Sequence, residues 1–265
     1  MIDIKIMGGL GNQMFQWACA RNYQEKYGHF LRYDVSFFDQ QSGESLCRRQ
    51  FALKKFPKIK FNTKSEQVQA PVRTNIVDYF DYKKFVIPSN VDNWYTMIGY
   101  WQSEKYFKEN EQIIRKELDF NEEIYYNITS KYPWITSEDT VSMHIRRTDY
   151  LTTGGVHPVQ PISYYKDAVD LIGNKEKIVV FSDDIEWCKA TLPFDNMVFA
   201  EGNDELIDLY LMSMCNDHII ANSSFSWWGA WLNSHKKKKV VAPAKWFGSG
   251  GMSYKDIVPE TWTKL

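Results

Sequence analysis

The feature that most constrains the fold is a regular alternation of short apolar runs and helical stretches in the second half of the chain. Apolar runs that predict strands occupy residues 140–145, 177–181, 197–199, 218–221 and 239–242. Stretches with the apolar spacing of helices lie between them, at residues 162–172, 185–191, 205–215 and 227–233. Strands that alternate with helices in this way are typical of α/β domains built on a parallel sheet.

A similar unit begins at the N-terminus. Residues 2–7 (IDIKIM) predict a strand, residues 8–11 (GGLG) a turn, residues 12–27 a helix and residues 30–35 a second strand. This order opens a doubly wound α/β domain. Glycines between a strand and a helix let backbone N–H groups approach a ligand, and the helix N-terminus favours anions. A plain tight turn explains the same glycines equally well.

A boundary between the two halves is expected near residue 135. The hydrophobic period breaks over residues 119–138, and Tyr132-Pro133 is typical of a break between elements. Residues 40–95 contain charge clusters and prolines, and the pattern does not order their elements. We predict an α/β domain over residues 1–135 and a Rossmann-like domain over residues 136–265, facing a cleft that holds a ligand at the carboxyl ends of the strands.

Composition excludes several classes of protein. The net charge of −1 excludes the basic field of a nucleic-acid-binding protein, and no apolar run reaches the roughly 18 residues of a membrane-spanning helix. The four cysteines have no metal-ligand spacing and are expected to be reduced. The chain enters its first strand at once, which argues against a signal peptide, so a cytoplasmic location is expected. The aromatic content of 16% fits sugar binding or a large aromatic core.

The first candidate site follows the strand at 140–145, in the stretch HIRRTDY. Arg146 and Arg147 lie just past this strand, and each guanidinium presents a planar fork of donors that matches two phosphate oxygens. One arginine could hold a diphosphate while the other pairs with Asp149. His144 points to the same face of the strand as Arg146. The alternative is a structural Arg–Asp pair at the end of a strand.

Two more strand ends in this half carry polar side chains. Asp183 and Asp184 could cap a helix or accept hydrogen bonds from a base or ribose. Ser223, Ser224 and Ser226, in NSSFSWWGAWL, could bind phosphate or only cap a helix, and the tryptophans of that stretch are more typical of a core. Together with the N-terminal glycines, four strand ends therefore carry groups that suit a nucleotide diphosphate.

Five stretches, GGLGNQMFQ, GYWQSEKYF, HIRRTDY, FSDD and NSSFSWWGAWL, in this order resemble the bacterial α-1,2-fucosyltransferases of glycosyltransferase family 11. The resemblance covers nearly the whole chain. It implies a GT-B-like α/β fold with two Rossmann-like domains, GDP-β-L-fucose as the donor, inversion at the anomeric carbon and no required metal. Residues 1–135 would then form the acceptor side, and residues 136–265 would bind GDP-fucose.

The resemblance also implies roles for single residues. Arg146 would bind the β-phosphate and stabilise the departing charge, and the candidate catalytic residues are Arg146, Asp149 and Asn12. The residues implied to contact the donor are Gly9, Gly11, Gln13, His144, Arg147, Asp183, Asp184, Ser223, Ser224 and Ser226.

The group that accepts the proton of the attacking hydroxyl is ordinarily a carboxylate or a histidine. Related α-1,6 enzymes carry a glutamate in the loop after the arginine motif, but this chain has no carboxylate between Asp149 and Asp167. Asp149, His157 and a late transfer with almost no base are therefore the remaining possibilities.

The expected reaction adds L-fucose to the 2-hydroxyl of a galactose-terminated oligosaccharide, in surface polysaccharide synthesis. Thr148, where many α-1,2 enzymes have glycine, leaves another linkage such as α-1,6 or another GDP-sugar open. A catalytically inactive nucleotide-sugar-binding module is the other alternative. The acceptor pocket is expected within residues 40–95, and no nucleic-acid partner is expected.

The lysine run at residues 236–239 is expected to be a solvated helix end. The alternative is peripheral contact with the inner face of a bacterial inner membrane that carries the lipid-linked glycan.

Overall fold

The structure is a computed structural model that describes residues 1–39, 49–61, 73–77, 81–83, 94–152, 155–248 and 253–265. It consists of two compact units. Unit 1 comprises Met1–Asp119 and Ser253–Pro259, and unit 2 comprises Phe120–Met252 and Glu260–Leu265. The units thus divide after Asp119, whereas the sequence placed the boundary after residue 135. The intervening helix α4 (Glu122–Lys131) and a 3₁₀ helix (Pro133–Thr136) pack against α7 (Glu205–Met214) of unit 2.

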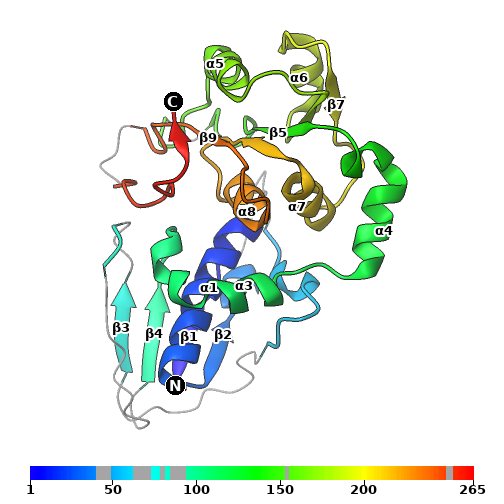
Figure 1. Cartoon of the computed structure of the whole chain (residues 1–265). Coiled ribbons are helices and arrows are strands. Elements are labelled where there is room, and N and C mark those ends of the chain that lie inside the picture. The colour runs from blue at the N-terminus through cyan, green and yellow to red at the C-terminus, as the bar shows by residue number, and fades with distance from the viewer. Residues whose placement is uncertain (40–48, 62–72, 78–80, 84–93, 153–154, 249–252) are drawn as a thin grey trace. The chain divides into compact units, whose positions relative to one another are not determined.

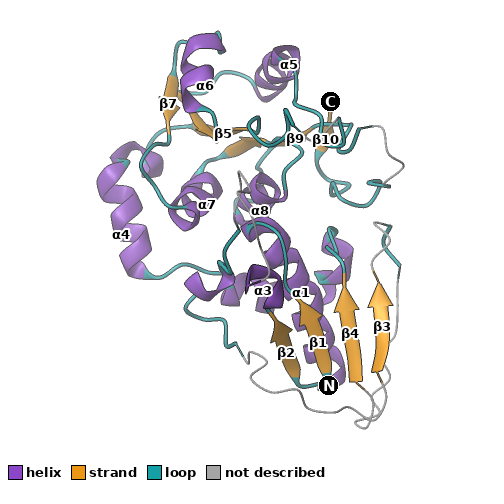
Figure 2. Cartoon of the chain, turned by 180° about the vertical axis from the view of Figure 1, so that it is seen from behind, coloured by secondary structure: helices purple, strands orange, loops and turns teal. Residues whose placement is uncertain are grey.

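Unit 1 contains a four-stranded parallel sheet in the order β2-β1-β4-β3. Its strands are β1 (Ile2–Lys5), β2 (Leu31–Asp34), β3 (Arg73–Val77) and β4 (Trp94–Ile98). Its helices are α1 (Leu10–Tyr27), α2 (Ser36–Asp39) and α3 (Glu111–Glu117), with 3₁₀ helices at Leu53–Lys55, Glu104–Tyr106 and Lys108–Asn110. Helices α1 and α3 lie on one face of the sheet, the near face in Figure 1 and the far face in Figure 2.

Two glycines set the bounds of α1. Gly8 has a φ of 80°, a left-handed conformation in which a side chain would be strained, and it turns the chain from β1 into the helix. Gly28 has a φ of 68°, and its N–H donates to Gln24 O at 2.9 Å, which ends the helix. The predicted strand, turn, helix and strand at the N-terminus are therefore confirmed.

Unit 2 contains a six-stranded parallel sheet in the order β10-β9-β8-β5-β6-β7. Its strands are β5 (Thr140–Ile145), β6 (Lys177–Ser182), β7 (Met197–Phe199), β8 (Asp217–Ile219), β9 (Val240–Ala242) and β10 (Thr263–Lys264). Besides α4 and α7, its helices are α5 (Ile162–Ile172), α6 (Ile185–Thr191) and α8 (Ser224–Leu232). Helices α5 and α6 lie on one face of the sheet and α7 and α8 on the other (Figures 1 and 2). The predicted alternation of strands and helices is confirmed.

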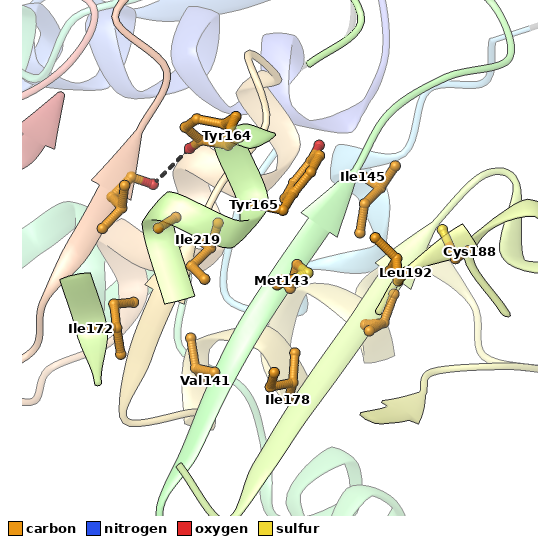
Figure 3. Close-up of a cluster of buried hydrophobic side chains, with 13 residues drawn as sticks. Val141, Met143, Ile145, Tyr164, Tyr165, Ile172, Ile178, Cys188, Leu192 and Ile219 are labelled. Atoms are coloured by element: carbon orange, nitrogen blue, oxygen red, sulfur yellow. Dashed lines mark hydrogen bonds between the residues drawn. The ribbon is translucent and has the colours of Figure 1, made fainter. Parts of the chain in front are cut away.

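The core of unit 2 on the α5 face comes from the alternation of side chains along β5. Val141, Met143 and Ile145 point to the same side of the strand and pack against Tyr164 and Tyr165 of α5 (Figure 3). Each large apolar side chain buried in this way contributes roughly 1.5–3 kcal/mol. The intervening residues of β5 therefore face α7 and α8, and His144 is one of them.

The lysine run after α8 is partly used inside the unit. Lys238 Nζ donates to Ala230 O at 2.7 Å, at the C-terminal end of α8, and Lys239 Nζ donates to Ile172 O at 2.8 Å, at the end of α5. Ammonium groups at helix C-termini satisfy carbonyls that have no partner within the helix. The predicted solvated run is confirmed for the exposed Lys236 and Lys237, whereas Lys238 and Lys239 bond to the ends of α8 and α5.

Candidate active site

The carboxyl ends of β5 and β8 form the switch point of the six-stranded sheet. From β5 the chain continues through β6 and β7 toward one edge, and from β8 through β9 and β10 toward the other. Doubly wound α/β domains bind ligands in the crevice at such a point. The HIRRTDY stretch leaves β5 here, and the NSSFSWWG stretch leaves β8 here. The structure therefore brings these two predicted stretches together.

Arg146 is held along one edge by two carboxylates. Its Nε and Nη2 donate to Asp149 Oδ1 and Oδ2 at 2.9 and 2.7 Å, and Asp183 Oδ2 lies 3.3 Å from Nε. Burial acts to lower the pKa of Arg146, but the hydrogen bond to Asp149 and the charges of both acids outweigh it and raise that pKa. Among the described residues, no acceptor lies within hydrogen-bonding distance of Nη1. The Nη1 side of the guanidinium is therefore available to an anion.

Asp183 fixes the backbone turn that follows β5. Its Oδ1 accepts from Arg147 N at 2.9 Å, and its Oδ2 accepts from Thr148 N at 3.1 Å and from Thr148 Oγ1. With Arg146 also beside it, this carboxylate has at least three donors and one cation. Its structural task is to position the arginine turn, and its predicted contact with a base stays a prediction.

Arg147 is oriented by a neighbouring helix. Its Nε donates to Asp184 Oδ2 at 3.0 Å, and its guanidinium carbon lies 3.8 Å from the ring centroid of Trp187, a stacking arrangement. Asp184 Oδ1 also accepts from Trp187 N at 3.4 Å at the start of α6. The helix-cap alternative for Asp184 is thus confirmed, and the same carboxylate holds Arg147 in place.

Asn222 links three loops at the carboxyl edge. It is 2% exposed. Its backbone O accepts from Tyr150 Oη at 2.8 Å, its Oδ1 accepts from Gln160 Nε2 at 3.0 Å, and its Nδ2 donates to Trp246 O at 3.0 Å. The loops after β5, β8 and β9 are thereby tied to one residue. Sequence reasoning gave no role to Tyr150, the last residue of the HIRRTDY stretch, and missed Gln160, which belongs to no motif.

Replacement of Asn222 by alanine is expected to lower kcat/KM for transfer by about tenfold to a hundredfold. The reason is that Gln160, in the loop that carries Arg146, and Trp246 lose their side-chain partner, while the bond from Tyr150 to the backbone O of residue 222 remains. Stability should fall by about 1–3 kcal/mol for each buried partner left unsatisfied. Steady-state kinetics and urea denaturation measure the two effects. The matched control is Asn216→Ala, since Asn216 Oδ1 accepts from Thr140 N at 2.9 Å at the opposite end of β5. The Asn216→Ala variant should lose stability and keep kcat/KM. An equal loss of activity in both variants would contradict the proposed role of Asn222 in joining the loops.

The serines after β8 are mainly structural. Ser223 Oγ accepts from Phe225 N at 3.3 Å and caps α8, so the cap alternative is confirmed for Ser223. Ser226 is fully buried, and its Oγ donates to Ser223 O at 3.3 Å. Ser224 is the first residue of α8 and is partly exposed. The tryptophans Trp227, Trp228 and Trp231 are buried in the core, as predicted.

Two histidines lie beside this edge and differ in surroundings. His144 is buried with its ring 5.9 Å from that of Phe225, and burial together with the charge of Arg146 lowers its pKa to about 3. The ring of His157 stacks on Tyr150 at 4.9 Å, and burial lowers its pKa too. Both rings are therefore neutral at pH 7. Neither Nδ1 has a hydrogen-bond partner among the described residues.

The other predicted residues, Gly9, Gly11, Asn12 and Gln13, lie in unit 1 at the start of α1. Gln13 is fully buried, and its amide serves the protein: Nε2 donates to Gly8 O and Gln50 O, and Oε1 accepts from Ala52 N. Gly11 is buried in the first turn. A Cβ at Gly9 would lie 3.6 Å from Arg49 Nη1, an ordinary van der Waals contact, so packing within the described residues does not require glycine there. Asn12 is the one of the four whose side chain is partly exposed.

Two features are absent from the described part of the chain. No three His, Cys, Asp or Glu side chains there lie close enough together to hold a metal ion. None of the helices in that part combines the length and the apolar character that crossing a bilayer requires.

Comparison with known proteins gave matches over the whole chain. The sequence profile of glycosyl transferase family 11 matches residues 1–265. An α-1,2-colitosyltransferase of Escherichia coli is 32% identical, with 100% of this chain and 99% of that protein covered. The O-antigen biosynthesis glycosyltransferase WbnK of Escherichia coli is also 32% identical, with 98% and 99% covered.

Among solved structures, the α-1,6-fucosyltransferase NodZ soaked with GDP-fucose superposes with a TM-score of 0.51 at 16% identity, covering 87% of this chain and 92% of that one. At this identity the likeness concerns the fold. The predicted fold class, α/β of the GT-B type with two Rossmann-like units, is confirmed.

Proposed function

Because the chain belongs to glycosyltransferase family 11, we propose that it transfers L-fucose from GDP-β-L-fucose to the 2-hydroxyl of a β-galactoside in a glycan, with inversion to an α-1,2 linkage. The observation that carries this proposal is the position of Arg146 at the switch point of unit 2, with one guanidinium edge held by acids and the Nη1 side available. The α-1,2 linkage is supported by the name of the colitosyltransferase relative.

The proposed chemistry is separation of charge at the anomeric carbon. As the bond from the sugar to the β-phosphate breaks, the ring gains positive charge and GDP gains negative charge. A guanidinium aimed at the departing phosphate stabilises that charge, and its acidic partners keep it oriented before the reaction. We assign Asp149 to this positioning task, because both of its oxygens accept from Arg146. His157, neutral at pH 7, is the residue of this edge that could accept a proton.

A second donor is favoured by one observation, the match to an α-1,2-colitosyltransferase. Colitose differs from L-fucose only in lacking the 3-hydroxyl. A site that hydrogen-bonds a substrate hydroxyl rejects the analogue without it by about 10⁴–10⁵, because buried polar groups then stay unpaired. The ratio of kcat/KM for GDP-fucose and GDP-colitose therefore distinguishes the two donors.

The test of the proposed function is an assay of purified protein with GDP-fucose, with and without lactose, in excess EDTA. GDP release that depends on lactose, with 2′-fucosyllactose as the product, is the expected result. A different linkage in the product, such as α-1,6, would contradict the proposed α-1,2 linkage. Binding of GDP-fucose without turnover of any galactoside would favour a nucleotide-sugar-binding module.

The EDTA arm tests the proposal that no metal is required. Activity should be the same with and without the chelator, because Arg146 and helix N-termini supply the positive charge that a metal would otherwise supply. Loss of activity in EDTA, restored by Mn²⁺, would overturn this part.

The biological setting that we propose is surface polysaccharide synthesis, supported by the O-antigen role in the name of one relative. The acceptor would be a galactose-terminated glycan on a lipid carrier, and the protein would act in the cytoplasm, with or without peripheral contact to the membrane. The predicted acceptor region, residues 40–95, lies partly outside the described residues.

A further inference from the structure

The carboxyl ends of β1 and β4 lie side by side in the sheet of unit 1, and the helices that follow these strands, α1 and α3, lie on the same face of that sheet. The loops after β1 and β4 are joined there by Gln16, which is fully buried. Its Oε1 accepts from Met7 N at 2.9 Å, and its Nε2 donates to Gly99 O at 3.1 Å. The two loops are therefore held together at the carboxyl edge of a parallel sheet, the edge at which α/β units bind ligands.

Gln102 is the central residue of a strained turn in the loop after β4. Ser103 N donates to Trp101 O at 2.8 Å, which closes a three-residue turn around Gln102. Trp101 has a φ of 54°, a left-handed conformation that is unfavourable for a bulky residue. Trp101 is 1% exposed with its ring edge-on to Tyr106, and Ser103 Oγ donates to Asp256 O at 2.7 Å. Packing thus imposes the strain, and strained turns of this kind gather at functional sites.

The turn aims Gln102 at Asn12 in the first turn of α1. Gln102 Nε2 donates to Asn12 Oδ1 at 2.7 Å. The other end of the Asn12 amide, Nδ2, lies over Gly8, since a Cβ there would be 2.8 Å from it. Gln102 therefore fixes the orientation of the Asn12 amide, here called its polarity. The amide oxygen accepts from Gln102, and the N–H₂ group faces the glycine loop.

The reverse orientation of both amides is less favourable. Gln102 Oε1 is buried without a partner, and turning both amides over would put an N–H₂ group in its place. An unpaired buried N–H is rarer in proteins than an under-satisfied oxygen. The hydrogen-bond polarity of Asn12 is therefore built into the fold.

We propose that Asn12 is a recognition site for a hydroxyl of the acceptor sugar, with Nδ2 donating to the sugar oxygen, and that Gln102 is its positioning residue. The inference rests on the proposed function, whose acceptor it makes more specific. The side chains that carry it are neutral amides, which match the hydroxyls of an uncharged sugar. The arginines suited to a diphosphate gather instead at the β5 and β8 edge of unit 2.

The test uses the isosteric change Gln102→Glu, which replaces the N–H₂ group by a carboxylate oxygen. A carboxylate cannot donate to Asn12 Oδ1, so the Asn12 amide must turn over and present its oxygen to the sugar. Asn12→Asp presents an oxygen there as well, while keeping the bond from Gln102. Both variants should weaken lactose binding at least tenfold, measured by titration calorimetry, and raise the acceptor KM by a similar factor with less than a threefold change in the KM for GDP-fucose.

The variant Gln102→Ala separates polarity from simple loss of structure. It leaves Asn12 able to rotate and choose its polarity, so its lactose affinity should lie between those of the wild type and Gln102→Glu. A merely structural role would make the truncation at least as harmful as the isosteric change. The matched control is Asn110→Asp, since Asn110 Nδ2 donates to Asn22 Oδ1 at 2.8 Å in a similar amide pair near the other end of α1. This control should bind lactose as the wild type does.

Equal lactose affinity in the wild type, Gln102→Glu and Asn12→Asp would overturn the inference, as would the absence of lactose binding to the wild type. Failure of the proposed function is seen separately. In that case GDP-fucose gives no GDP release with lactose, while the calorimetric comparison still decides the role of Gln102.

Discussion

Replacement of Arg146 by alanine is expected to lower kcat for sugar transfer by a factor of about 10²–10³, which corresponds to about 3–4 kcal/mol of transition-state stabilisation. The reason is that the guanidinium is pre-oriented by Asp149 and Asp183 toward the charge that develops on the departing GDP. Alanine also leaves two half-buried carboxylates without their cation, so a loss of stability of about 1–3 kcal/mol should accompany the loss of rate.

Arg146→Lys distinguishes these two effects. Lysine keeps a positive charge beside the acids but loses the planar fork, so stability should recover while kcat stays at least about tenfold low. Stopped-time assays of GDP release and urea denaturation give the two quantities. Arg115→Ala is the matched control, because Arg115 pairs with Glu111 at 2.8 Å on α3 of unit 1, and it should leave kcat unchanged. Near-normal turnover by Arg146→Ala would show that the guanidinium does not contact the leaving group.

Acidification from pH 7 to pH 5 is expected to destabilise unit 2 by about 2–3 kcal/mol. Burial lowers the pKa of His144 from 6.5 to about 3, and burial lowers that of His218 well below 6.5. Below pH 6.5 these histidines therefore bind a proton in the unfolded chain but not in the folded chain. The free energy of unfolding falls for this reason by about 2 kcal/mol per histidine at pH 5. Asp208 acts in the opposite direction, since burial raises its pKa from 3.8 to about 6, and offsets about 1 kcal/mol.

The neutral state of His218 is enforced by its partners. Asn233 Oδ1 accepts from His235 N at 2.7 Å, which leaves Asn233 Nδ2 to donate to His218 Nε2 at 2.8 Å. The ring proton must then lie on Nδ1, which faces Ser142 Oγ at 2.7 Å. A second ring proton would therefore displace a donor from a fully buried site.

Urea denaturation across this pH range tests the prediction through its slope. His218→Gln should lower the free energy of unfolding at pH 7 and reduce the further loss down to pH 5 by about 2 kcal/mol. The exposed His235 is the control, and His235→Gln should leave the slope as in the wild type. An unchanged slope in His218→Gln would mean that His218 accepts its proton without unfolding.

The parts of the fold that could be predicted from sequence are those in which buried apolar residues recur with the period of a helix or a strand. β5, α5, α6 and β7 have the predicted bounds, because each presents an apolar face to the sheet core. Helix α4 was missed, since Ile128 is its one buried residue and no apolar stripe marks it. β4 was not predicted either. Its buried and partly exposed residues alternate, but the strand has only five residues and follows a region in which no periodic pattern was recognised.

The site divides in the same way. Residue types with a chemical signature, the arginines and acids, could be placed at strand ends because parallel strands share a carboxyl edge. The sequence predicted that the arginine not bound to phosphate pairs with Asp149, but Asp149 pairs with Arg146, the arginine implied to bind phosphate, and Arg147 pairs with Asp184. It also could not show that Asp183 holds the turn after β5. Asn222 and Gln16 lie in two of the five stretches, but their roles in joining loops were not predicted, because a buried amide that links loops looks like any other polar residue in the sequence.

The order in which the ribosome makes the chain bears on how these units can form. Residues 253–259 belong to unit 1, although they are synthesised after residues 120–252 of unit 2. Asp256 in that segment accepts from Ser103 Oγ and pairs with Lys105 at 2.6 Å, so unit 1 lacks these anchors while unit 2 is being made. Completion of unit 1 before the rest of the chain emerges, the usual order for N-terminal domains, is therefore impossible here. A fragment that stops at residue 119 should for the same reason be a poor substitute for unit 1, and the two units are best expressed as one chain.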